Sequence, residues 1–100
     1  MTFASVGTLG VQPGKRDEVV AILTRANFGN DDVGCLLYEV GINDDEPDTV
    51  FVIELWTSPE AHQASLQLDS VRAAITEAMP FLSGQMSGSR FTVVGSPLRP

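Results

Sequence analysis

The residues with the clearest capacity for chemistry are a carboxylate, an indole and an imidazole that follow one another closely. Glu54 and Trp56 are separated by one residue within an apolar stretch, and His62, the only histidine, follows shortly after. A carboxylate among apolar side chains has its charged form disfavoured, which raises its pKa and makes it a candidate general base. An imidazole titrates near neutral pH and carries protons readily. These three residues predict a site that handles a proton.

Each of these side chains also has a plainer interpretation. Trp56 would wall an aromatic pocket or simply pack in the core. Glu54 would act as a base, or form an ion pair with an arginine at a strand end or across a dimer. His62 would carry protons, or lie on the surface of a short amphipathic helix. Tyr38, on an apolar strand face, would hydrogen-bond a ligand or cap the core.

Apolar periodicity predicts the elements that must position these residues. Strands are expected at residues 3–11, 35–42, 49–56 and 90–95, each bounded by turn residues. One helix carries Val19, Ile22, Leu23 and Ala26 on a single face and ends at residues 29–32. A second helix begins at Ser58-Pro59, breaks near residues 68–70 and ends at Pro80. A Gly/Ser-rich loop at residues 83–89 leads to the last strand.

The strand at residues 49–56 is apolar on both faces, whereas a strand with one wet face alternates apolar and polar residues. One face carries Val50, Val52 and Trp56, and the other carries Phe51, Ile53 and Leu55. Two helices cover only one face of a small sheet, so the other face would be an exposed apolar patch typical of an interface. We therefore expect a homodimer through the Phe51 face, with the Glu54 and Trp56 face meeting the helices and holding any pocket. The alternative is that a tail or loop covers the second face.

The bulk composition sets further limits. The chain has 100 residues and a formal net charge of -7 at pH 7. We expect one globular domain over residues 1–100, with an ordered core at about residues 3–95. The negative charge argues against nucleic acid or a membrane surface as a partner. Cys35 is the only cysteine, and no signal-like or bilayer-spanning run is visible, so we expect a cytoplasmic location.

Four stretches in order resemble the antibiotic biosynthesis monooxygenase family. They are VQPGKR at 11–16, VGCLLYEV at 33–40, IELWTSPEA at 53–61 and VRAA at 71–74. The resemblance covers nearly the whole chain. It implies an α+β, ferredoxin-like β-α-β-β-α-β sandwich with an antiparallel four-stranded sheet, paired into a dimeric α/β barrel.

The resemblance also implies an activity. Studied relatives convert phenols, anthrones or quinols to quinones without metal or flavin, so no cofactor and no metal ligand are expected here. The predicted function is a cofactor-independent monooxygenase-like oxidation of a small aromatic or quinol by dioxygen. The catalytic candidates are Glu54, His62 and Trp56. The substrate-binding candidates are Tyr38, Ser65, Phe28 and Phe81, the two phenylalanines because they flank the expected helix ends.

The chain departs from the family at three positions, one of which is Val52, where some oxidase members carry an asparagine four residues before the tryptophan. Relatives commonly carry a histidine nine residues after the tryptophan, and often another five residues later, where this chain has Ser65 and Ser70. The departure keeps a second interpretation open, namely a non-catalytic dimer that binds a small hydrophobic ligand or serves as a scaffold. Haem degradation, known among relatives, is the least favoured interpretation.

Overall fold

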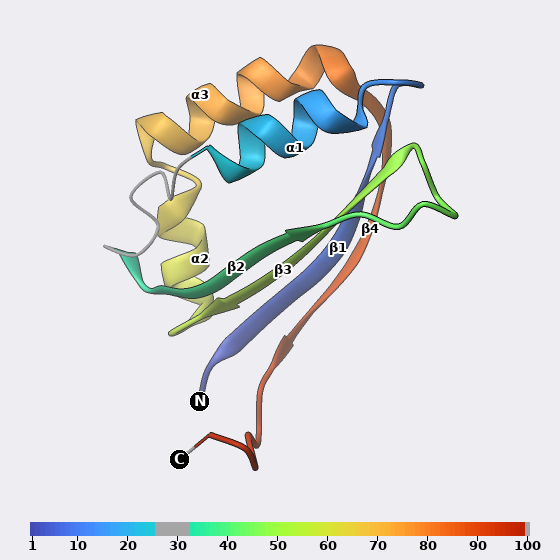
Figure 1. The fold of residues 1–100 in the computed structure, drawn as a ribbon. Coiled ribbons are helices and arrows are strands. Elements are labelled where there is room, and N and C mark those ends of the chain that lie inside the picture. Colours follow the sequence, from blue (N-terminus) through green and yellow to red (C-terminus); the bar gives the residue numbers. More distant parts are fainter. Residues whose placement is uncertain (26–32, 100) are drawn as a thin grey trace.

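The protein folds as one antiparallel sheet with helices on one of its sides (Figure 1). The computed structural model describes residues 1–25 and 33–99. The elements are β1 (Phe3–Val11), α1 (Arg16–Thr24), β2 (Cys35–Gly41), β3 (Thr49–Trp56), α2 (Pro59–Ser65), α3 (Asp69–Ala78), a 3₁₀ turn (Met79–Phe81) and β4 (Leu82–Thr92). The strand order is β2-β3-β1-β4. This is the ferredoxin-like arrangement expected from the sequence, with the second helix divided into α2 and α3.

The register of the sheet decides which side chains face the helices. Residues directly opposed on antiparallel strands point to the same face. Ser5 on β1 pairs with Glu54 on β3 and with Arg90 on β4, and Tyr38 on β2 also pairs with Glu54. Trp56 lies two residues beyond Glu54 and shares its face. The prediction that the Glu54 and Trp56 face meets the helices is confirmed, because this face lies under the helices and Trp56 is 0% exposed.

Two apolar clusters hold the helices on this face. The first joins β1, α1 and β3 through Val11, Val19, Val50 and Val52. The second joins α1 to α3 through Ile22, Ala74 and Ala78. Their small and β-branched side chains let α1 lie close to both the sheet and α3. These clusters occupy one end of the helix-covered face and leave the other end to α2.

The start of α2 fixes the position of the only histidine. Ser58 caps the helix as predicted, because its Oγ accepts a hydrogen bond from the backbone N–H of Ala61 at 3.0 Å, and Pro59 follows in the first turn. A serine cap and an early proline both favour a helix start. The helix ends at Ser65, and α3 begins at Asp69, where the sequence predicted a break. His62 is therefore in the first turns of a short helix that packs over the end of β3.

The other predicted elements agree closely with the structure. β1 and β3 have the predicted bounds, and β2 ends at Gly41 rather than one residue later. In the predicted apolar face of α1, Val19 and Ile22 are buried. Ala26 and residues 29–32, which were expected to complete and end that helix, lie outside the described residues.

The last strand differs from the prediction. Residues 83–89, predicted to be a loop, belong to β4, and residues 93–95, predicted to be strand, lie beyond its end. Pairing with β1 over nearly its whole length supplies the backbone hydrogen bonds that the weak strand propensity of Gly and Ser does not predict. Gly7 and Gly88 face each other in this pairing, and a Cβ on Gly88 would lie 2.6 Å from the carbonyl oxygen of Val6. The glycines that indicated a loop instead allow two strands to approach closely.

The face of the sheet opposite the helices is open and carries several exposed apolar side chains. Ile53 is 52% exposed and Phe91 is 48% exposed, and Leu37 beside them is also exposed. No segment within residues 1–25 and 33–99 lies over this face (Figure 1). We call it the outer face. The part of the chain that is described therefore does not supply the tail or loop that was the alternative to a dimer.

Candidate functional site

A small cavity lies where α1, α2 and α3 meet the sheet. Its volume is about 140 Å³. Its polar lining consists of Tyr38, Glu54, Trp56, His62 and Ser65, and its apolar lining of Leu23, Leu66, Val71, Ala74 and Ile75. The structure thus brings five of the seven residues predicted for the site to one cavity. They come from β2, β3 and α2, and only the fold places them together.

Glu54 is at the centre of the polar group. Its Oε1 accepts a hydrogen bond from the indole Nε1 of Trp56 at 3.1 Å and lies 3.9 Å from the Nε2 of His62. Burial raises the pKa of Glu54, while the hydrogen bond from Trp56 and the charge of Arg90 lower it by smaller amounts. The carboxylate therefore has one oxygen fixed by the indole and a greater affinity for a proton than an exposed glutamate.

His62 is buried rather than exposed, so the interpretation as a surface histidine is wrong. Its exposed fraction is 5%. Its ring lies 5.3 Å from the Trp56 ring in an edge-on arrangement and 6.0 Å from the ring of Phe3. Burial, and to a lesser degree the charge of Arg90, lower the pKa of His62. The imidazole is therefore neutral at neutral pH, and its 3.9 Å approach to Glu54 is not an ion pair under those conditions.

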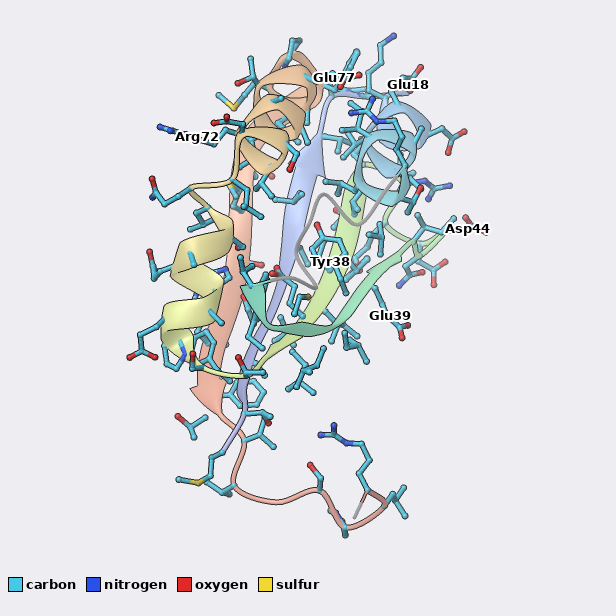
Figure 2. All side chains as sticks on the ribbon, turned by 90° about the vertical axis from the view of Figure 1, so that its left-hand side faces the viewer. Glu18, Tyr38, Glu39, Asp44, Arg72 and Glu77 are labelled. Carbon is cyan, nitrogen blue, oxygen red and sulfur yellow. The ribbon has the colours of Figure 1, made fainter. Side chains whose placement is uncertain are left out.

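Tyr38 closes the cavity from the side of β2. Figure 2 shows its side chain in the space between the strands and the helices, whereas the neighbouring Glu39 points away from them. Burial, together with the nearby charge of Glu54, raises the pKa of Tyr38 to about 12. The phenol therefore keeps its proton at neutral pH and can donate a hydrogen bond into the cavity.

Ser65 lines the cavity, but its hydroxyl is already engaged. Ser65 is 3% exposed, and its Oγ donates to the backbone carbonyl oxygen of His62 at 2.7 Å. A hydroxyl of this kind shapes the wall and has no free proton to offer. Ser65 therefore does not replace the histidine that relatives commonly carry at this position.

Of the two predicted phenylalanines, Phe81 is described by the structure and does not line this cavity. Phe81 packs against the apolar clusters near Val11 and Ile22, under the Nζ of Lys15. Phe28 lies outside the described residues. Conversely, sequence reasoning missed Phe3, which lies against His62, and Arg90, whose charge acts on Glu54 and His62. Only the register of β1 with its neighbours could have revealed them.

The described residues offer neither a cluster of metal ligands nor a membrane-spanning helix. No three of their His, Cys, Asp and Glu side chains gather closely enough to hold a metal ion. None of the described helices is both long enough and apolar enough to cross a membrane.

Comparison with known proteins identifies the relatives of the chain. The family model described as antibiotic biosynthesis monooxygenase matches residues 2–77. No curated protein sequence matches the chain.

Solved structures agree with the family match. A provisionally named antibiotic biosynthesis monooxygenase from Chloroflexus aurantiacus J-10-fl has 33% sequence identity and a TM-score of 0.82, covering 96% of each chain. One from Caulobacter crescentus CB15 has 25% identity and a TM-score of 0.83, over 94% of this chain and 91% of that one. A third, from Deinococcus radiodurans, has 22% identity and a TM-score of 0.79 over 94% of each chain, which supports the fold alone. The chain belongs to the antibiotic biosynthesis monooxygenase family.

Proposed function

We propose that the protein is a cofactor-independent, monooxygenase-like enzyme that oxidises a small aromatic or quinol substrate with dioxygen. The observation that carries the proposal is the position of Glu54. Its carboxylate has a raised pKa, accepts a hydrogen bond from Trp56 and lies beside a neutral His62 in one cavity. Groups with perturbed pKa values that converge on a cavity are candidates for proton-transfer chemistry.

The size of the cavity supports an aromatic substrate. Its volume of about 140 Å³ is close to the roughly 150 Å³ of an engineered cavity that binds benzene. One ring of a phenol or quinol would fit there. The edge of that ring would contact Trp56 and His62, because aromatic groups favour edge-on or offset contacts with one another.

The polar lining supplies both a proton acceptor and a donor. In the proposal Glu54 accepts the phenolic proton, with His62 as the second acceptor beside it. The indole of Trp56 holds Oε1 of Glu54, which leaves Oε2 to meet the substrate. The phenol of Tyr38 stays protonated and donates a hydrogen bond to the phenolate oxygen as it forms.

Deprotonation allows the substrate to act as the reductant for dioxygen. A phenolate or an anthrone anion is electron-rich and can transfer electrons to O₂ directly. In the net reaction of a phenol, a ring carbon loses its one hydrogen and gains one oxygen atom as the new carbonyl, and the hydroxyl group loses its hydrogen as it becomes the other carbonyl. The second oxygen atom leaves as water, and the substrate supplies all the electrons. The protein would position the ring, remove the proton and stabilise the anion.

One observation favours the binding-only alternative. The Ser65 hydroxyl, at the position where relatives commonly carry a histidine, is engaged with the helix backbone and offers no second proton-transfer group to the cavity. A protein that binds an aromatic ligand without oxidising it would need the same ring-sized cavity but no proton acceptor. The activity of variants at Glu54 and His62 separates the two functions.

We propose in addition that the protein works as a homodimer through the outer face. Ile53 and Phe91 are about half exposed there, and large exposed apolar side chains gathered on one face are typical of an interface. A second copy of the same face is self-complementary under two-fold symmetry. In this arrangement the outer face is buried while the cavity stays under the helices of each subunit.

Oxygen uptake by metal-free protein, measured with a panel of dihydroxyaromatics, tests the proposed oxidation. We expect uptake above background for some members of the panel. Glu54→Gln keeps the shape of the side chain and its acceptor for Trp56 but removes the base, so it should lower the rate by about 10²-fold or more. His62→Ala should lower it less. The matched control is Glu18→Gln, which removes a carboxylate from the exposed surface of α1 (Figure 2) and should leave the rate unchanged.

Absence of uptake above background across the panel would reject the oxidation of those substrates. Bound ligand without uptake would favour the binding-only protein. Unchanged rates in both Glu54→Gln and His62→Ala would reject the assignment of the proton acceptor.

A further inference from the structure

A second, larger cavity adjoins the first on the helix side of the sheet. Its volume is about 540 Å³, and Tyr38 and Glu54 line both cavities. Pockets that bind small molecules usually have volumes of roughly 300–1,000 Å³. The smaller cavity alone is therefore too small for more than one ring, and the larger one, which we call the β1–β4 groove, has room for the rest of a substrate.

The floor of the β1–β4 groove has no side chains at its centre. Gly7 and Gly88 are directly opposed on β1 and β4, and both lie on the face that carries Glu54. A Cβ at either glycine would come within 2.7 Å of a backbone oxygen on the other strand, so the floor stays bare. A bare strand surface is flat on the scale of an aromatic ring, and a planar ring system can lie directly on it.

The two ends of the groove differ in chemistry. On one side of the glycines Leu9 is opposed to Met86, which makes an apolar end. On the other side Ser5 lies between Glu54 and Arg90, which makes a polar end. Neighbouring strands are about 4.8 Å apart, so the backbones of Glu54 and Arg90 are separated by about 10 Å across β1.

Arg90 is the only cation lining either cavity within the described part of the chain. It makes no hydrogen bond or ion pair with any described residue, whereas Arg16 pairs with Asp44, and Arg25 with Glu77. Its positive charge reaches the site, because it lowers the pKa values of both Glu54 and His62. The protein has a formal net charge of -7. An unpaired guanidinium at the end of a cavity is therefore a local positive charge that can bind an anion.

We propose that the β1–β4 groove binds the remote part of the substrate, and that this part is planar and ends in a carboxylate held by Arg90. The inference rests on the proposed function, since it assumes that the phenol end of the same molecule meets Glu54. A guanidinium presents two parallel N–H groups that match a carboxylate. The separation of Glu54 and Arg90 across Ser5 suits a molecule with a phenol at one end and a carboxylate at the other, whose planar middle lies over Ser5 and the adjoining Gly7 and Gly88.

Equilibrium binding of two probes tests the proposal without requiring turnover. The probes are para-hydroxycinnamate, which is planar with a phenol and a carboxylate at opposite ends, and its methyl ester, which lacks the negative charge. Titration calorimetry on the whole protein should show about tenfold tighter binding of the anion than of the ester. This factor is at the lower end of what a charged hydrogen bond contributes, because Arg90 is exposed. Arg90→Gln should remove this preference and leave the affinity for the ester within about twofold.

Two further variants make the test specific. Arg90→Lys keeps the charge and should retain part of the preference. Arg72→Gln removes the same charge from the exposed surface of α3 (Figure 2), away from both cavities, and should change neither affinity.

Four outcomes would overturn the proposal. The first is equal affinity of the wild-type protein for both probes, and the second is no binding of either probe. The third is that Arg90→Gln lowers the affinity for both probes equally. The fourth is that Arg72→Gln lowers the affinity for the anion as much as Arg90→Gln does. If the wild-type protein prefers the anion but shows no oxygen uptake, the proposed oxidation is rejected and the Arg90 subsite is still supported.

Discussion

The hydrogen bond from Trp56 to Glu54 predicts that the cost of a tryptophan substitution depends on pH. Trp56→Phe removes the Nε1–H donor that lies 3.1 Å from Oε1 of Glu54. The substitution also removes volume from a side chain that is 0% exposed, and that cost is the same at every pH. The loss of the hydrogen bond matters most when Glu54 is ionised, because charged acceptors form stronger hydrogen bonds.

The size of the pH-dependent part follows from the two kinds of hydrogen bond. A hydrogen bond to a charged group contributes about 1.5–3 kcal/mol and one to a neutral group about 0.5–1.5 kcal/mol. The free energy of unfolding lost in Trp56→Phe should therefore be about 1 kcal/mol larger at about pH 8 than at about pH 4.

The sign of this change follows from linkage. Burial raises the pKa of Glu54 in the folded protein, so the stability that Glu54 contributes is present at low pH and is lost as the pH rises through its folded pKa. Without the Trp56 donor this pKa rises further, and the loss of stability becomes larger.

Urea denaturation of the wild-type and variant proteins at the two pH values measures the difference. The control is the same substitution made in a Glu54→Gln background, where no charge forms and the cost of Trp56→Phe should not change with pH. A cost that is equal at both pH values in the wild-type background would refute the reasoning. So would the same pH dependence in the Glu54→Gln background, because the titrating group would then lie elsewhere.

Three further predictions concern other parts of the molecule. Ser58→Ala removes the cap of α2 and should lower the free energy of unfolding by about 1 kcal/mol in denaturation experiments, and a change below a few tenths would contradict the capping geometry. Ile53→Glu places a charge on the outer face and should convert a sedimenting dimer to a monomer that keeps its far-UV spectrum, whereas a wild-type monomer would reject the interface. The pKa of His62 measured by NMR should lie below the usual range of histidine, since burial lowers it. The free energy of unfolding should therefore fall as acid protonates the ring. A pKa within the usual range of histidine would contradict the burial of the ring.

Much of the fold could be predicted because apolar periodicity and turn residues agreed with the final structure. The bounds of β1 and β3, the Ser58 cap and the break before α3 were readable from local patterns. β4 was not, because its residues 83–89 are rich in Gly and Ser and have little strand propensity of their own. That segment is a strand because β1 pairs with it, and such long-range pairing leaves no local mark in the sequence.

The candidate site could be predicted only in part for a related reason. Glu54, Trp56 and His62 were found because each residue type is suited to proton transfer and the three lie close in sequence. The burial of His62 depends on α2 packing over the end of β3, and helix periodicity alone left it on the surface. Arg90 comes from a strand that was only partly predicted, so its place opposite Ser5 followed from the register and not from any motif.

His62 supplies an imidazole to the cavity although Ser65 and Ser70 stand where relatives commonly carry histidines. Residues three apart on a helix lie on the same side, so His62 and Ser65 both face the cavity from α2. An imidazole placed one turn earlier lies near the end of β3, against Trp56 and within 3.9 Å of the Glu54 carboxylate. His62 therefore places an imidazole in the cavity on the side of the Glu54 carboxylate. If the protein oxidises its substrate, the proton should pass to the Glu54 and His62 pair at the β3 side of the ring. The opposite side is then left to the apolar residues of α3.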